Sequence, residues 1–301
     1  MPLSESLPTA MSEFASDLLR KQPFPGYRLA NCLASDSARA AFKADGLNLN
    51  HSVAVKALRP WPGREGTAEE FFSLAGSIAR LHVPGAARGL DTGRGGGAFF
   101  LVYEFIPGES LAARLARRQS GRLTEKESLR LVAELARILQ KLFDFGHPHG
   151  HLHPANIILG EGGKATLLDM GFAWTLAWPD DAAAFLAAPE HLPPERIAGE
   201  LSVDIRGDLY SLGTIWHAVL LGEPVFRGRL PRETLTLHLE REPIPPREID
   251  PRLSAATSGL ILWLLSKDRG ARPRTPKEFL RKLEAHPLLK SEEPPTAKPG
   301  C

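Results

Sequence analysis

Apolar positions follow two different periods along the chain. In the first third, HSVAVKAL alternates apolar and polar residues and is rich in β-branched side chains, while GGAFFLVYEFI is a continuous apolar run. These patterns predict strands, the second of them buried on both faces. Between them, GTAEEFFSLAGSIARLH places Phe71, Leu74, Ile78 and Leu81 at helical spacing behind a capping threonine. This segment predicts a helix.

From about residue 109 onward the period becomes helical. Wide apolar faces recur in SLAARLARR, TEKESLRLVAELARILQKLF (with Thr124 as its N-cap), RGDLYSLGTIWHAVLLG, LSAATSGLILWLLSK and TPKEFLRKLEAHPLL. Each of these segments predicts a helix. The predicted fold class is therefore α+β, with a small β-rich lobe followed by a larger, mainly helical lobe.

Composition excludes several function classes. The 301 residues contain 37 Lys and Arg against 35 Asp and Glu, a net charge of +2, and no long basic stripe, so we expect no nucleic-acid partner. No apolar run reaches the ~18 residues that a membrane span needs. The two cysteines, Cys32 and Cys301, suggest no disulfide framework and fit a reducing compartment. We expect a cytoplasmic protein without a membrane segment.

Both ends of the chain differ in composition from the middle. Residues 1–25 mix polar residues with one short amphipathic piece, EFASDLLRK, and end in PFPG. We interpret them as a loosely attached, partly disordered leader without a secretory signal. The final residues, 290–301, are proline-rich and polar, which predicts a disordered tail.

The stretch HPHGHLHPANIIL, residues 147–159, has four histidines at alternate positions, and LLDMG follows it with Asp169 and Gly171. The combination resembles the catalytic core of protein kinases, in which H-R-D-L-K-P-E-N is followed by D-F-G. The aligned positions are, in motif order, His149, Gly150, His151, Leu152, His153 and Asn156.

The resemblance extends over roughly residues 27–287. VAVK matches the lysine strand, FLVYEFIPGESL the gatekeeper and hinge, LPPERIAG the A-P-E element, DIRGDLYSLGTI the helix after it, and SKDRGARP the segment whose arginine pairs with the A-P-E glutamate. The resemblance implies a protein-kinase-like two-lobed fold, with an N-lobe and hinge over 26–106, including one αC helix, and a C-lobe over 107–289. The matched residues are Lys56, Tyr103 as gatekeeper, Glu104 to Ile106 as hinge, Glu195, Asp208 and Arg272.

Metal binding is the alternative interpretation of the histidine row. Imidazole is a common zinc ligand, and alternate residues share one face of a strand. However, the family has a loop here, so the alternation need not place the rings together. Cysteine and carboxylate partners are also absent from the stretch. The metal hypothesis is therefore the weaker one.

Several positions that bind nucleotide in the family are altered. Ala34, Asp36 and Arg39 stand where the family has three glycines, whose backbone N–H groups cover the phosphates of ATP. Side chains restrict that turn, and Asp36 adds negative charge. Leu74 stands where an αC glutamate would hold the lysine of VAVK.

The catalytic positions are altered too. His151 replaces the aspartate that orients the attacking hydroxyl and accepts its proton, and His153 replaces the lysine that steadies the transferring phosphate. Ala188 replaces a threonine that tethers the substrate loop, and Gly150 replaces the arginine that reads activation-loop phosphate. These losses fall on groups that contact one another in the family.

Other positions are retained. Lys56 matches the residue that contacts phosphates, and Asn156 and Asp169 match the ligands of Mg²⁺. Weak binding of ATP and Mg²⁺, or a polar network that fills the site without nucleotide, both remain open. The resemblance implies structural roles for the remaining matched residues, which are His149, Gly171, Glu195, Asp208 and Arg272.

Three functions follow from the resemblance. The first is a pseudokinase, a kinase-like domain that acts as a scaffold or allosteric partner of another protein. The second is an active Ser/Thr protein kinase in which His151 serves as the base. The third, a small-molecule phosphotransferase, is suggested by HGHLHPANI, but those enzymes also keep the aspartate, and the segments around Asp208 and Arg272 resemble Ser/Thr kinases instead.

Overall fold

The computed structural model describes residues 11–35, 39–47, 51–59, 77, 81–117, 121–170, 188–200 and 204–290. The chain divides into two compact units, Met1–Pro107 and Gly108–Cys301, and each is described by itself. The predictions for Asp36, Leu74, Gly171, most of the αC helix, residues 1–10 and the tail from 291 lie outside the described residues.

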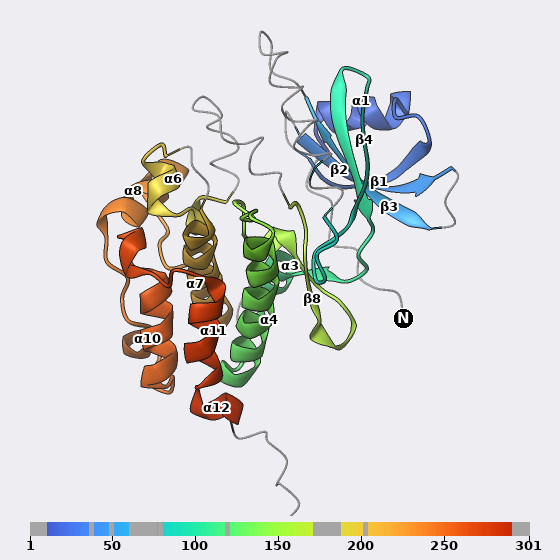
Figure 1. The fold of residues 1–301 in the computed structure, drawn as a ribbon. Coiled ribbons are helices and arrows are strands. Elements are labelled where there is room, and N and C mark those ends of the chain that lie inside the picture. The colour runs from blue at the N-terminus through green and yellow to red at the C-terminus, as the bar shows by residue number, and fades with distance from the viewer. Residues whose placement is uncertain are drawn as a thin grey trace, which may run out of the picture. The chain divides into compact units, whose positions relative to one another are not determined.

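The first unit contains a five-stranded antiparallel sheet (Figure 1). Its strands are β1 (Tyr27–Ser35), β2 (Arg39–Gly46), β3 (Ser52–Leu58), β4 (Gly89–Gly95) and β5 (Ala98–Glu104), in the spatial order β1-β2-β3-β5-β4. The alternating segment HSVAVKAL forms β3, and the continuous apolar run forms β5, which is buried on both faces except at its last residue. Both strand predictions are confirmed.

The register gives the sheet two chemically different faces. Val55 of β3 pairs with Phe42 of β2 and Val102 of β5, and all three are buried. The next residue, Lys56, pairs with Ala41 and belongs to the opposite face. We call these two surfaces the apolar face and the lysine face.

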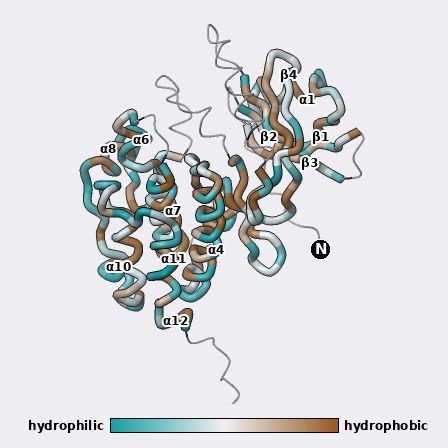
Figure 2. Tube along the Cα trace, in the orientation of Figure 1, coloured by the Kyte–Doolittle hydropathy of each residue, from teal (hydrophilic) through white to brown (hydrophobic). Residues whose placement is uncertain are grey.

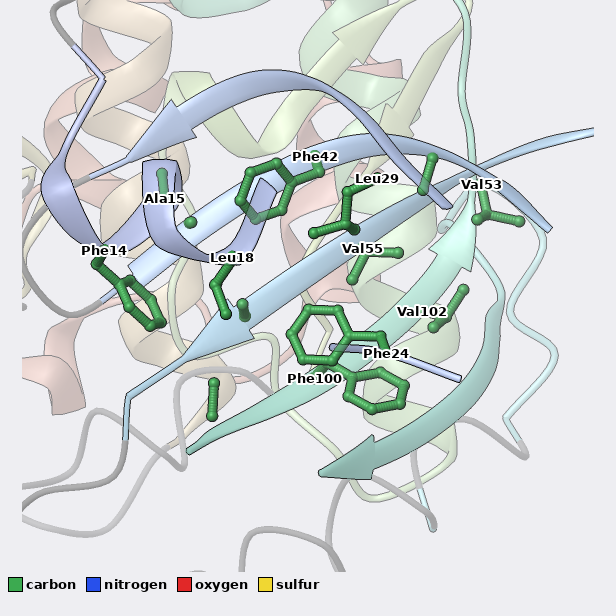
Figure 3. Close-up of a cluster of buried hydrophobic side chains, with 14 residues drawn as sticks. Phe14, Ala15, Leu18, Phe24, Leu29, Phe42, Val53, Val55, Phe100 and Val102 are labelled. Atoms are coloured by element: carbon green, nitrogen blue, oxygen red, sulfur yellow. The ribbon is translucent and has the colours of Figure 1, made fainter. Parts of the chain in front are cut away.

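Helix α1 (Glu13–Lys21) covers the apolar face. Its Phe14, Ala15 and Leu18, together with Phe24 from the following turn, are at most 4% exposed. Figure 3 shows Phe14 and Leu18 of α1, and Phe24, beside the side chains of the sheet. The core also contains residues of β1, β2, β3 and β5, among them Leu29, Phe42, Val53, Val55, Phe100 and Val102.

The interpretation of residues 1–25 as a loosely attached leader is therefore wrong for residues 11–25. A nine-residue helix is marginally stable in isolation, and EFASDLLRK is stable here because it packs on the apolar face of the sheet.

A glycine of β4 also contributes to this packing. A Cβ on Gly95 would lie 2.1 Å from the carbonyl oxygen of Pro23, so only glycine lets the segment after α1 lie against this strand.

The second unit is mainly helical. Among its described residues, the helices of six or more residues are α3 (Leu111–Ala116), α4 (Glu125–Asp144), α7 (Ile205–Leu221), α8 (Pro231–Glu240), α10 (Ala255–Leu264) and α11 (Pro276–Glu284). Shorter helices are α6 (Pro194–Ile197), α9 (Pro246–Ile249) and α12 (Pro287–Lys290), and three short strands, β6 (Glu109–Ser110), β7 (Ile157–Leu159) and β8 (Ala165–Leu167), form a second sheet. With the sheet of the first unit, these helices confirm the α+β fold class.

Helix α7 is the centre of this unit. Almost all of its residues are buried, and it packs against α4 and α10 (Figure 1). Along α4 and α11, hydrophilic and hydrophobic positions alternate (Figure 2), as expected for helices with one buried face. Thr124 caps α4 as predicted, in a capping box with Glu127. Within the described residues, no helix combines the length and apolar character of a membrane span.

Replacing both Phe14 and Leu18 of α1 by alanine should destabilise the first unit. Each change removes a nearly fully buried side chain, and large-to-small core changes typically cost about 2–5 kcal/mol each. Urea unfolding followed by fluorescence measures the loss. Arg20→Ala, on the exposed side of the same helix, is the matched control and should change stability by less than about 0.5 kcal/mol. An equal, small effect of both variants would show that α1 does not stabilise the sheet.

Candidate functional site

Residues 147–153, which carry the four histidines and which we call the histidine loop, lie between α4 and the 3-10 helix η2 (Pro154–Asn156). One buried carboxylate anchors this loop. Asp208 of α7 accepts hydrogen bonds from His149 N and Gly150 N, both at 2.7 Å. Gly150 has φ +72, a conformation that side chains disfavour, which accounts for glycine at this position. Burial raises the pKa of Asp208 to about 7, although the two N–H groups act in the opposite direction.

His149 connects this loop to the end of β8. Its ring is completely buried. Nε2 lies 2.8 Å from the carbonyl oxygen of Leu168, and Nδ1 accepts a hydrogen bond of 3.2 Å from His151 N. Because a carbonyl only accepts, Nε2 carries the proton and the ring is the neutral Nε2–H tautomer. Both nitrogens of His149 therefore bind backbone groups, one within the loop and one at the end of β8.

His151 is held by Asn156. The Nδ2 amide group of Asn156 lies 3.3 Å from His151 Nδ1 and donates to His151 O at 3.1 Å. An amide nitrogen donates, so His151 Nδ1 is the acceptor, and in the neutral ring Nε2 carries the proton. The imidazole at the position of the family's aspartate therefore presents an N–H donor on its other nitrogen.

His153 follows on the same loop, with its ring edge-to-face against His151 at a centroid distance of 4.5 Å. It caps η2, because its Nδ1 accepts from Ala155 N at 3.3 Å. Burial, helped by His151 and His191, holds the pKa of His153 well below its usual range. The ring is neutral near pH 7 and does not supply the positive charge of a lysine.

The metal hypothesis receives no support from this arrangement. The Nδ1 atoms of His149, His151 and His153 all accept hydrogen bonds from N–H groups of the loop or of Asn156. Within the residues that the structure describes, no three His, Cys, Asp or Glu side chains are grouped as metal ligands.

Asn156 and Asp169 are brought together by the hairpin of β7 and β8. Leu168 N donates to Asn156 O at 2.8 Å, and Asp169 is the next residue. Both side chains are about 95% buried. Asp169 has φ +63, a conformation that asparagine and aspartate tolerate better than other side chains and that often occurs at functional sites. One amide oxygen and one carboxylate are the hard oxygen ligands that Mg²⁺ prefers, so these two residues fit that ion.

The predicted nucleotide-contacting residues belong to the first unit. The register places Arg39, Lys56 and Tyr103 on the lysine face, on β2, β3 and β5. Ala34 is exposed near the end of β1. After Tyr103 come Glu104, whose Oε1 accepts from Arg88 N at 2.8 Å, and the half-buried Ile106.

Glu195 of α6 and Arg272 form a bidentate ion pair, with both N···O distances 2.8 Å. Their side chains are 7% and 0% exposed. Arg272 also donates to the backbone oxygens of Ser266, Lys267 and Arg206. The pair therefore joins α6 to the start of α7 and to the segment after α10.

The sequence interpretation missed His191. Its Nδ1 lies 2.8 Å from Thr214 Oγ1, and Ser211 Oγ donates to its backbone oxygen at 2.7 Å. Burial lowers the pKa of His191 to about 3, and its ring is among the groups that keep His153 neutral. No signal in the sequence marks it, because a single histidine among apolar residues is most often part of a core. Ala188, nearby, caps the 3-10 helix η5 (Pro189–His191) without a side-chain hydrogen bond.

Comparison with known proteins gives a consistent result. The family model for the protein kinase domain matches residues 40–287. The serine/threonine-protein kinase pkn2 of Myxococcus xanthus is 33% identical over 91% of this chain, which spans 34% of that protein. The serine/threonine-protein kinase PknB of Mycobacterium tuberculosis is 30% identical over 90% of this chain and 44% of its own length. The chain therefore spans between a third and a half of these curated relatives.

Among solved structures, the PknI kinase domain of Mycobacterium tuberculosis superimposes with a TM-score of 0.69 at 22% identity, covering 87% of this chain and 96% of that one. This likeness concerns the fold. It agrees with the antiparallel sheet of the first unit and the helices of the second.

Arg272→Ala should lower the free energy of unfolding by about 3–5 kcal/mol, because it leaves the buried Glu195 without its partner. The double variant Glu195→Leu, Arg272→Met should lose less than Arg272→Met alone, since it leaves no unpaired charge. Urea unfolding of the three variants gives the comparison. A double variant that loses as much stability as Arg272→Met, or more, would contradict the role of the pair.

Buried histidines should make the free energy of unfolding fall as the pH is lowered. Burial lowers the pKa values of His191, His217 and His238 to about 3, 4 and 3. In the unfolded chain these histidines bind protons as the pH falls through about 6.5, whereas in the folded chain they do not. Their contribution to the free energy of unfolding is therefore fully present above that pH and is lost below it. Asp208, with a raised pKa of about 7, binds its proton in the folded state and has the opposite sign.

Between pH 5 and 6, unfolding should bind about two protons at these four groups, because the three histidines gain one each and Asp208 releases one. The free energy of unfolding should therefore rise by about 2.7 kcal/mol per pH unit in this range. Unfolding free energies measured in urea across this range give the slope. His217→Gln should reduce the uptake by about one proton. An unchanged slope in that variant would contradict the assignment.

Proposed function

Because this chain belongs to the protein kinase domain family, we propose that it is a Ser/Thr-kinase-like domain with little or no phosphotransferase activity. Such a pseudokinase acts as a scaffold or allosteric partner of another protein. The hydrogen bond from Asn156 Nδ2 to His151 Nδ1 is the observation that carries this proposal, since the resemblance aligns His151 with the catalytic base.

A general base needs an available lone pair within reach of the proton that it accepts. The Nδ1 lone pair of His151 already accepts a hydrogen bond from Asn156 Nδ2, and Nε2 of the neutral ring carries a proton. The family's carboxylate is an acceptor with a negative charge. His151 has no negative charge, and its one acceptor atom is already bonded to Asn156, so acting as a base would require it to leave Asn156.

Phosphoryl transfer also depends on neutralising charge on the phosphate. The depressed pKa of His153 supports a neutral ring where the family has a lysine. When bound, Mg²⁺ would neutralise phosphate charge, and Asn156 and Asp169 are the residues that would hold it. Lys56, on the lysine face, would contact the phosphates of ATP. We therefore propose that ATP and Mg²⁺ bind weakly and that turnover is slow.

An active Ser/Thr protein kinase is the second candidate, and the comparisons favour it. The relatives that match over nine-tenths of this chain are named serine/threonine-protein kinases. In this case His151 would exchange its hydrogen bond to Asn156 for one to the substrate hydroxyl.

The partner in either case is another protein. Cys32 is a free thiol, which fits a reducing compartment, and we propose the cytoplasm.

Transfer of radiolabelled phosphate from ATP to a generic protein acceptor separates the two candidates. We expect the wild-type chain to transfer phosphate slowly or not at all, and His151→Ala to leave any residual rate within about threefold. If His151 is the base, the wild type should turn over readily and His151→Ala should lower the rate about 10²–10⁴-fold. Asp208→Ala, which removes the anchor of the loop, reports whether any activity depends on the loop at all.

A further inference from the structure

The five-stranded sheet of the first unit ends in two weakly buried edge strands. Among the described strands, β1 pairs with β2 alone and β4 pairs with β5 alone. Leu29 is the one buried residue of β1, and β4 has none. An edge strand with a single neighbour and little buried surface has low local stability. On the ladder alone, the two edges would therefore open independently of each other.

The segment 12–27, which we call the strap, is bonded to β1 at both ends of α1. At the start of the helix, Ser12 N donates to Ser35 Oγ at 2.9 Å. At its end, the side chain of Gln22 takes the place of a neighbouring strand, because Nε2 donates to Leu29 O at 3.0 Å and Oε1 accepts from Leu29 N at 2.7 Å. Gln22 has φ +48, a conformation that costs free energy in a residue with a side chain and that these bonds hold in place.

The strap also contacts β4, the opposite edge. Tyr27 OH donates to Asp91 Oδ2 at 2.9 Å. Burial and this hydrogen bond raise the pKa of Tyr27 to about 12, so the phenol is a donor at neutral pH. A Cβ on Gly95 would lie 2.1 Å from Pro23 O, which places the backbone of the strap directly against this strand. One segment therefore contacts both edges, although the ladder has three strands between them.

Buried rings join the strap to the strands between its two contacts. The ring centroids of Phe24 in the strap and Phe100 of β5 lie 4.4 Å apart (Figure 3). Phe100 in turn pairs with Gly93 of β4, where a Cβ would lie 2.3 Å from the ring. Close-packed groups of this kind transmit a displacement, since they have no free volume in which to absorb it. The strap cannot follow one edge outward without disturbing its contacts with the other.

We propose that the strap couples the two edges of the sheet, so that β1 and β4 open as one cooperative unit. A partner that holds or displaces either edge then changes the opening of the other, and the coupling is reciprocal. This conformational device goes beyond the proposed function, because it operates whether or not the chain transfers phosphate.

Hydrogen–deuterium exchange of the full chain, read in peptides from β1, β4 and the central β3, tests the coupling. Gln22→Met keeps the length of the side chain but removes the amide, whose hydrogen bonds go to Leu19 and Leu29 and not to β4. We expect exchange to rise about tenfold in β1 and at least about threefold in β4, with β3 unchanged. Arg28→Ala, which breaks an exposed ion pair between β1 and β2, is the matched control and should leave β4 unchanged.

The reverse direction starts from β4. Gly95→Ala forces a Cβ against Pro23 O and should raise exchange in β1 as well as in β4. Gly97→Asn is the control in the same hairpin, because nothing lies within 4 Å of that position and asparagine tolerates its φ of +72. Tyr27→Phe removes a single hydroxyl and provides the same comparison if Gly95→Ala does not fold, with β4 and the Ser35 end of β1 as the two readouts.

Exchange that rises in β1 and β4 together, while β3 is unchanged, supports the proposal. A rise confined to the strand that each variant contacts would overturn it, because the edges would then open separately. If β3 rises as well in the two stronger variants, the unit is opening globally, and Tyr27→Phe decides between the same two outcomes. None of these measurements uses nucleotide, so their result is separate from that of the radiolabelled transfer assay.

Discussion

The histidine loop depends on one buried carboxylate. Asp208, from the most buried helix of its unit, accepts the backbone N–H groups of two consecutive loop residues. A buried N–H group that loses its partner costs about 1–3 kcal/mol, so these bonds fix the path of the chain whatever side chains the loop carries. The loop can therefore keep its backbone while the side chains at the positions aligned with the family's motif change.

That separation explains how His149, His151 and His153 can occupy the loop with their ring nitrogens bonded to groups of the protein itself. His149 uses both ring nitrogens on backbone groups, and His151 and His153 each accept one N–H group of the same loop. The rings act as hydrogen-bonding parts of a compact turn. Their tautomers follow from their partners, and the chemistry available at His151 and His153 is that of neutral N–H donors.

Much of the fold could be predicted from local sequence pattern. The spacing of apolar residues in β3 and β5 differs from their spacing in the helices of the second unit, so strands and helices can be told apart. Thr124 also marks a helix start by its own hydrogen-bonding chemistry. By contrast, α1 could not be placed from sequence, since its stability comes from the distant Phe42, Val55 and Phe100.

The candidate site, like the fold, could be predicted only in part from the sequence. Motif order located the positions of the loop, but not the direction of its hydrogen bonds. The tautomer of His151 depends on Asn156, and the neutrality of His153 depends partly on His191, which no motif marks.

The position of α1 also bears on where the folded domain begins. The family match starts at residue 40, within β2. A fragment cut there would lack α1 and β1, exposing Phe42, Val55 and Phe100 to water and turning β2 into an unpaired edge. A newly exposed edge strand has free backbone N–H and C=O groups that can pair with other chains. Such a fragment would tend to aggregate, and its insolubility would say nothing about the chain that includes α1 and β1.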